Sequence, residues 1–207
     1  MDNYLLYGMK ESGNAYKVAL MLELTDTPWE PVWVDFFNGE TRGDSFREKV
    51  NEMGEVPVLE RGNLKLSQSG VILDYLAAET GQFGGGDADE KREILRWILF
   101  DNHKLTSNTA TYRFLTNFAK GADKAVTDFL AGRMHGAFKI LNVHLENQDF
   151  AVGDTPTIAD FSLCGYLFYP EEFGVSWEEH YPAIGAWLSR IQALKGWKHP
   201  YDILPSE

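Results

Sequence analysis

The first eighty positions alternate short apolar runs with longer amphipathic stretches. Across residues 14–24 the apolar positions recur every three or four residues, which predicts a helix that buries one face. Further helices are predicted near residues 45–49 and over 69–79, and strands over 4–7, 31–36, 56–59 and 64–66. The predicted order is therefore βαβαββα. Strands joined through helices pair in parallel, whereas the last two strands flank the turn Arg61-Gly62-Asn63 and form an antiparallel hairpin.

The rest of the chain carries only helical periodicity. Residues 82–89 include the run Gly84-Gly85-Gly86 and no periodic pattern, which predicts a linker. Helices are predicted over residues 91–117, 122–146, 157–169 and 183–195. The 207 residues therefore divide into an α/β domain over residues 1–81 and an all-α domain over residues 90–207.

Composition and charge narrow the class of partner. Hydrophobic residues make up 44% of the chain, and 13 Phe, 9 Tyr and 6 Trp can fill a sizeable core. A formal charge of −12 repels nucleic acid and anionic membranes, so neither is an expected partner. No stretch is apolar enough to span a bilayer, and the first residues lack the features of a signal peptide, so a cytoplasmic location is expected.

Cysteine and histidine usage argues against redox and metal chemistry. The single cysteine, Cys164, cannot form a disulfide within the chain, and its apolar surroundings predict a buried thiol. Because no second cysteine follows at Cys-x-x-Cys spacing, two-cysteine redox chemistry is excluded. The 5 His are scattered without ligand spacing, so no metal site is expected.

Three short segments could hold a ligand, although each also has a purely structural interpretation. Pro57 opens a strand: a cis bond would turn the Val56 backbone outward toward an extended peptide, whereas a trans bond would make it an ordinary edge proline. Ser69 is a predicted helix N-cap whose free N–H groups suit a carboxylate, with Gln68 placed to accept from an ammonium. Ser12 precedes the first helix, either as a cap alone or as a hydroxyl that stabilises a thiolate.

The order and spacing of these segments resemble the cytosolic glutathione S-transferases, particularly the bacterial members with an active-site serine. Residues 51–59 resemble the family's Asn-Pro-x-Gly-x-Val-Pro-x-Leu segment, and residues 66–76 resemble its Glu/Gln-Ser-x-x-Ile-x-x-Tyr-Leu segment. Tyr7 together with residues 12–18 is similar to the start of many bacterial members, and residues 153–160 resemble the capping motif before a buried helix. In that motif Thr157 and Asp160 form a predicted capping box, which is structural and not catalytic.

The resemblance implies a thioredoxin-like N-terminal domain, an all-helical C-terminal domain, glutathione as co-substrate and a homodimer. Implied glutathione contacts are Val56 and Pro57 for the cysteinyl backbone, Gln68 and Ser69 for the γ-glutamyl end, and Arg42 as the best candidate for the glycine carboxylate. An electrophile site between the domains is expected to use Met9, Lys10, Glu11, Lys104, Asn108 and Tyr112, each of which also has a packing or solvated interpretation.

Activation of the glutathione thiol is open among three residues. An unperturbed thiol titrates near about 8.5, and lowering its pKa by about two units requires roughly 2.7 kcal/mol of thiolate stabilisation. A hydroxyl hydrogen bond plus a helix N-terminus can supply that amount. Ser12 is the leading candidate because it lies at a helix start. Tyr7 resembles the tyrosine that other branches of the family use. Asn14 or backbone N–H groups could assist or replace Ser12.

The predicted function is conjugation of glutathione to a small electrophile. Three positions depart from the family pattern: Glu52 replaces proline, Glu55 stands where Lys or Gln is common, and Gly70 stands where a small polar residue or Asn is common. Glu55 and the lack of a clear basic residue for the glycine carboxylate favour the alternative of a non-catalytic glutathione-binding or interaction module. Isomerase, dehalogenase and peroxidase activity on the same scaffold stay open.

Overall fold

The structure, a computed structural model, describes residues 3–206 and divides them into two compact units. The first unit contains the described residues up to Gln82 together with those from Leu194 onward, and the second spans Phe83–Ala193. The sequence analysis placed everything after the linker in the second domain, whereas the last segment packs in the first unit. The reason is a set of polar contacts: the Tyr16 hydroxyl donates to the Lys198 carbonyl at 2.9 Å, and the Lys198 ammonium pairs with Glu23 at 2.8 Å.

The first unit is built on a mixed four-stranded sheet in the order β2-β1-β3-β4. Its strands are β1 (Tyr4–Gly8), β2 (Trp29–Trp33), β3 (Val58–Arg61) and β4 (Leu64–Ser67). β1 runs parallel to β2 and antiparallel to β3, and β3 and β4 form the predicted hairpin. β2 begins earlier than predicted because it pairs with β1 from Tyr4 onward, and its edge position accommodates Pro31.

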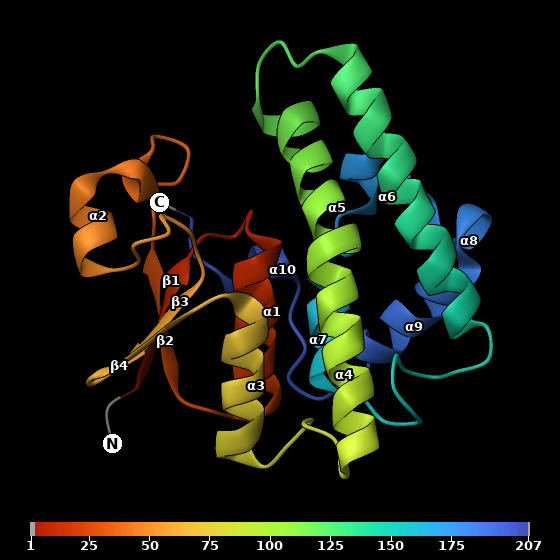
Figure 1. The fold of residues 1–207 in the computed structure, drawn as a ribbon, viewed down its shortest axis with the longest axis horizontal. Helices are drawn as coiled ribbons and strands as arrows, with labels where there is room; N and C mark the ends of the chain where they lie inside the picture. The colour runs from red at the N-terminus through yellow and green to blue at the C-terminus, as the bar shows by residue number, and fades with distance from the viewer. Residues whose placement is uncertain (1–2, 207) are drawn as a thin grey trace. The chain divides into compact units, whose positions relative to one another are not determined.

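Two helices, α1 (Gly13–Leu24) and α3 (Ser69–Thr80), cover one face of this sheet, and the short helix α2 (Asp44–Lys49) lies on the other side (Figure 1). The 3₁₀ turn η1 (Glu40–Arg42) leads into α2. Leu6 of β1, Leu59 of β3 and Leu73 of α3 are completely buried, so the core lies between the sheet and the helix pair. Burial of these side chains supplies the main driving force for folding the unit.

The second unit is all-helical. The predicted helix over residues 91–117 is one helical run that contains two π-helical segments: α4 (Ala88–Phe100), η2 (Asp101–Leu105), α5 (Thr106–Arg113) and η3 (Phe114–Phe118). The long helix α6 (Lys124–Leu145) lies beside α5 (Figure 1). The later elements are α7 (Ile158–Cys164), η4 (Pro170–Phe173), α8 (Trp177–His180) and α9 (Pro182–Gln192), and α10 (Pro200–Ile203) belongs to the first unit. None of the helices described has the length and apolar character needed to cross a membrane.

Helix α7 is buried along its whole length and begins at the predicted capping box. The Thr157 backbone N–H donates to the Asp160 carboxylate at 2.8 Å, and the Thr157 hydroxyl oxygen accepts from the Ala159 N–H at 3.3 Å. Asp160 also accepts from the Ala151 N–H at 2.7 Å and from the Trp187 indole at 2.8 Å. The capping box is confirmed, and Cys164 is a buried thiol as expected.

The helix predicted over residues 157–169 is shorter in the structure, since α7 ends at Cys164. Pro170 disfavours helical backbone at the preceding residue, and Tyr169 accordingly leaves the helical region with φ −123° and ψ 47°.

Candidate functional site

Three loops converge at one edge of the sheet in the first unit. Tyr7 of β1 pairs with Val58 of β3, and Val58 pairs with Ser67 of β4. The residues that follow β1, precede β3 and follow β4 therefore leave the sheet side by side, because adjacent strands lie about 4.8 Å apart. The three segments singled out by their sequence, around Ser12, Pro57 and Gln68, are brought to the same edge.

Ser12 caps the helix that begins at this edge. Its hydroxyl oxygen accepts from the Ala15 N–H at 3.1 Å, and its carbonyl accepts from the Tyr16 N–H at 2.9 Å. Within the described residues the hydroxyl hydrogen of Ser12 is not donated to any acceptor. The cap therefore occupies only the acceptor side of the group, and the O–H can still donate to a ligand beside the positive end of α1.

The two other candidates for thiol activation have different surroundings. The Tyr7 hydroxyl donates to the Glu60 carboxylate at 3.3 Å, and burial followed by the negative charge of Glu60 raises the pKa of that hydroxyl. Asn14 lies in the first turn of α1, and its side-chain oxygen is buried without a hydrogen-bond partner among the described residues. Tyr7 is thus committed to a carboxylate, whereas Asn14 offers both an acceptor oxygen and an NH₂ donor, and Ser12 offers a hydroxyl donor.

The loop before β3 is held in a defined shape. The Val56–Pro57 peptide bond is cis, as one interpretation of the sequence required, and Pro57 is buried while Val56 is partly exposed. Asn51 closes the loop from both sides: its amide nitrogen donates to the Glu55 carbonyl at 2.9 Å, and its side-chain oxygen accepts from the Met53 N–H at 3.1 Å. The strand starts two residues later than predicted, at Val58, the first residue of β3 that pairs with β1.

The predicted capping role of Ser69 is wrong. Helix α3 begins at Ser69 itself, and the N-cap is Gln68, whose backbone has φ +69° and whose side chain does not cap the helix. The Gln68 carbonyl accepts from the Ile72 N–H at 3.0 Å, which fixes the start of the helix one residue earlier. Ser69 is buried in the first turn of α3, where its hydroxyl and N–H lie at the positive end of the helix.

The side chain of Gln68 points back to the loop before β3. Its amide nitrogen donates to the Glu55 carboxylate at 3.0 Å and approaches the Met53 sulfur at 3.4 Å. This contact was not predicted: from the sequence, Glu55 stands out as a departure from a family pattern that favours a non-catalytic module. No periodic signal links two loops that lie thirteen residues apart.

The remaining predicted residues lie on several elements of the two units. Arg42 is exposed at the end of η1, and within the described residues its guanidinium has no hydrogen bond or ion pair. Met9 is buried and Lys10 partly exposed in the loop after β1. In the second unit Lys104 is exposed and Tyr112 is partly buried. Asn108 is buried there, with its amide nitrogen donating to the Lys104 carbonyl and its oxygen accepting from Arg133.

The chemistry available at the sheet edge is the recognition of an extended, charged molecule. Helix N-termini at Ser12 and Ser69 favour anionic groups, and the side-chain oxygens of Gln68 and Glu55 favour a cation. Among the described residues no group of three or more His, Cys, Asp or Glu could hold a metal ion.

Comparisons with known proteins agree with this arrangement. Residues 6–83 match the N-terminal domain family of glutathione S-transferases, and residues 104–195 match the C-terminal domain family. A crystal structure of a glutathione S-transferase from Pseudomonas fluorescens is 31% identical, with coverage of 93% of this chain and 96% of that chain and a TM-score of 0.85.

Two more distant relatives extend the comparison. Glutathione S-transferase F14 of Arabidopsis thaliana is 25% identical over 181 residues, which span 82% of this chain and 71% of the relative. A glutathione transferase homolog from Lodderomyces elongisporus, solved with two GSH per subunit, is 22% identical. The match has a TM-score of 0.87 and covers 99% of this chain and 100% of that chain, which shows that the two proteins share a fold.

Proposed function

Because the chain belongs to the glutathione S-transferase family, we propose that it binds glutathione at the sheet edge of the first unit and conjugates the sulfur to a small electrophile. The observation that carries this proposal is the convergence of Ser12, Val56–Pro57 and Gln68–Ser69 through the register of three adjacent strands. The glutathione bound in the Lodderomyces homolog supports the choice of ligand.

In this proposal each loop holds one part of the tripeptide. The Val56 backbone next to Pro57 pairs with the cysteinyl unit, and Gln68 and Ser69 bind the ammonium and carboxylate of the γ-glutamyl end. Arg42 stays the predicted partner of the glycine carboxylate, since its guanidinium is exposed and uncommitted within the described residues. Holding the thiol in place lowers the entropic cost of attack on a second molecule.

Ser12 is the proposed activator of the thiol. Its free O–H can donate to the sulfur, and the bond to the Ala15 N–H fixes the hydroxyl at the end of α1. A hydrogen bond to a charged group is worth about 1.5–3 kcal/mol, and a helix N-terminus adds about 0.3–1 kcal/mol. Together these terms match the roughly 2.7 kcal/mol needed to lower the thiol pKa by about two units.

The electrophile contacts Met9, Lys10, Lys104, Asn108 and Tyr112 stay predictions, as do the homodimer and the cytoplasmic location. The alternative is a glutathione-binding module without turnover, which the negative charge of Glu55 beside Gln68 favours. Isomerase, dehalogenase and peroxidase activities would use the same activated sulfur.

The test combines binding with turnover. Isothermal titration calorimetry of glutathione against the full chain measures binding, and conjugation is then followed with an activated aryl chloride, an unsaturated aldehyde and an alkyl halide, with a peroxide as a separate substrate. Binding plus conjugation of any electrophile supports the proposal. Binding without turnover of the whole panel supports the module, and absence of binding contradicts both.

A further inference from the structure

The orientation of the Gln68 amide is determined by its partners. The Glu55 carboxylate oxygen lies 3.0 Å from the Gln68 amide nitrogen, and the Met53 sulfur lies 3.4 Å from the same nitrogen. An ionised carboxylate accepts hydrogen bonds and cannot donate them, so the amide must present its NH₂ group to Glu55. Its carbonyl oxygen is consequently left as the group that can accept from a ligand.

The backbone on both sides of this contact is fixed independently. Gln68 has a φ of +69°, which is uncommon for a residue with a side chain, and its carbonyl is held by the Ile72 N–H. Glu55 is held by the bond from the Asn51 amide to its carbonyl. The contact therefore joins two segments whose backbones are held by other hydrogen bonds, and removing it frees the amide without removing either segment.

We infer that Glu55 is a positioning residue that sets the Gln68 amide for the α-ammonium of the γ-glutamyl group. This inference rests on the proposed function. Glu55 turns the side-chain carbonyl oxygen of Gln68 toward the α-ammonium, which donates a hydrogen bond to that oxygen. Glu55 also places a negative charge close to the ammonium. The site thereby selects a tripeptide with a cationic amino terminus over one without it.

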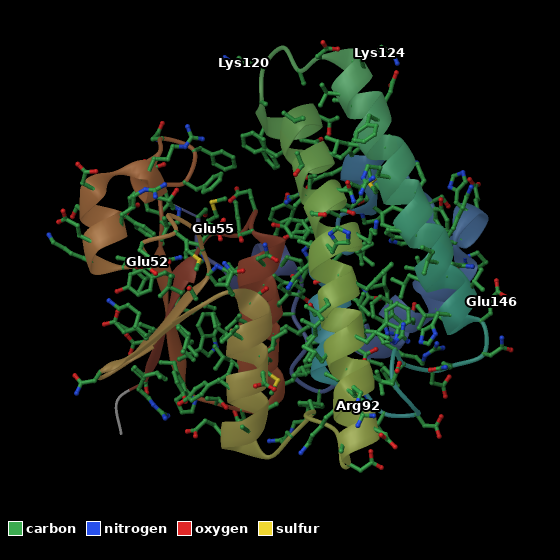
Figure 2. All side chains as sticks on the ribbon, viewed as in Figure 1. Glu52, Glu55, Arg92, Lys120, Lys124 and Glu146 are labelled. Carbon is green, nitrogen blue, oxygen red and sulfur yellow. The ribbon has the colours of Figure 1, made fainter. Side chains whose placement is uncertain are left out.

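The loop offers a matched control. Figure 2 labels Glu52 and Glu55, which come from the same loop and are both exposed. The side chain of Glu52 makes no hydrogen bond or ion pair within the described part of the chain, and only its backbone carbonyl accepts, from Arg47 at 3.1 Å. Replacing Glu52 with Gln removes the same charge from the same loop but leaves Gln68 in place.

The experiment compares two ligands by isothermal titration calorimetry: glutathione, and its analogue in which hydrogen replaces the α-amino group. In Glu55→Ala, glutathione affinity should fall about tenfold while affinity for the analogue changes less than about twofold, as expected for a lost charge-assisted contact. Glu55→Gln keeps an oxygen that can accept from the Gln68 amide and should lose only about threefold. Glu52→Gln should bind both ligands within about twofold of the unsubstituted protein.

Each other outcome decides against the inference in a recognisable way. Equal losses for both ligands in Glu55→Ala mean that Glu55 only supports the loop, and unchanged affinities mean that it does not orient the amide. Either result overturns the inference about Glu55. The glutathione-binding part of the proposed function is still supported in that case, provided that the unsubstituted protein binds glutathione. If the unsubstituted protein does not bind glutathione, the proposed function fails and the inference fails with it. Thermal unfolding of each variant confirms that the compared proteins are folded.

Discussion

At the scale of single residues, the question is which group stabilises a thiolate at the sheet edge. Ser12 combines an oxygen fixed by the Ala15 N–H with a hydrogen that is free to donate within the described residues. The Tyr7 hydroxyl is already used by Glu60, whose charge opposes a second anion nearby. The Asn14 oxygen is buried without a hydrogen-bond partner among the described residues and cannot donate to a thiolate, so Asn14 could act only through its amide NH₂ group.

Ser12→Ala should raise the pKa of bound glutathione. The lost hydrogen bond is worth about 1.5–3 kcal/mol, which corresponds to about one to two pKa units. Conjugation at neutral pH should fall roughly ten- to a hundredfold and recover partly at high pH, where thiolate forms without help. The ultraviolet absorbance of the thiolate, titrated against pH in the complex, measures the shift directly.

Tyr7→Phe is the matched control, since it removes a hydroxyl from β1, the strand that precedes Ser12. We expect it to leave the titration of bound glutathione unchanged. A shift in Tyr7→Phe together with none in Ser12→Ala would assign activation to the tyrosine. If neither variant shifts, backbone N–H groups or Asn14 hold the sulfur.

At the scale of elements, the loop before β3 has almost no freedom at its glycine. Gly54 has a φ of +69°, and a Cβ built there would lie 2.7 Å from the Thr41 carbonyl oxygen. Gly62, in the hairpin turn, has a similar φ of +60°, but a Cβ there would meet nothing within 4 Å. An Ala at Gly62 would therefore introduce backbone strain alone, whereas an Ala at Gly54 would introduce the same strain together with steric overlap.

Gly54→Ala should therefore destabilise the protein more than Gly62→Ala. The positive φ alone costs about 1–2 kcal/mol in either variant. Overlap with a backbone carbonyl in Gly54→Ala should add about 1–3 kcal/mol, because the η1 turn or the loop must shift. Urea unfolding at equilibrium gives both values, and equal losses would show that the loop relaxes freely around residue 54.

Element types were predictable from the sequence, and element ends less so. Periodicity identified α1 and α3 correctly as helices. α3 has one buried face as expected, whereas α1 is buried on nearly all sides, since every residue from Ala15 to Leu22 is buried. The limits of β2 and β3 depend on pairing with β1, which involves residues distant in sequence. For the same reason Ser69 was mistaken for a cap, since the positive φ of Gln68 has no local signature.

The candidate site was predictable only as separate segments. Ser12, Pro57 and Gln68 each have a local interpretation, and the family resemblance joined them before strand register gave a physical reason. The contact between Glu55 and Gln68 could not be predicted, because it depends on side-chain orientation between two loops.

At the scale of the whole molecule, the decrease of stability in acid includes a contribution from His135, a partly buried histidine of the second unit. The His135 Nδ1 lies 2.9 Å from the Tyr181 hydroxyl, and its ring stacks on that tyrosine. Burial, followed by the charges of His180 and Lys139, lowers the pKa of His135 below its ordinary 6.5. The unfolded chain therefore binds a proton at His135 more readily than the folded chain does.

The unfolding free energy should consequently decrease as the pH falls below 6.5 toward the lowered pKa of His135. The slope from one group is at most about 1.4 kcal/mol per pH unit. His135→Gln keeps a hydrogen-bonding side chain but cannot titrate, so its stability should decline less over the same range. Urea unfolding at several pH values checks this, and identical pH profiles for both proteins would contradict the assignment.

The segment from Leu194 onward gives the molecule an unusual order of assembly during synthesis. The sheet and its two helices leave the ribosome first, and the segment that contacts Tyr16 and Glu23 leaves only after the whole second unit. At typical rates of translation, the second unit takes roughly ten seconds to be made in between. The proposed glutathione-binding unit therefore stays incompletely covered until the segment from Leu194 onward is made, and a nascent polypeptide stalled within the all-helical unit would expose that uncovered surface to chaperones.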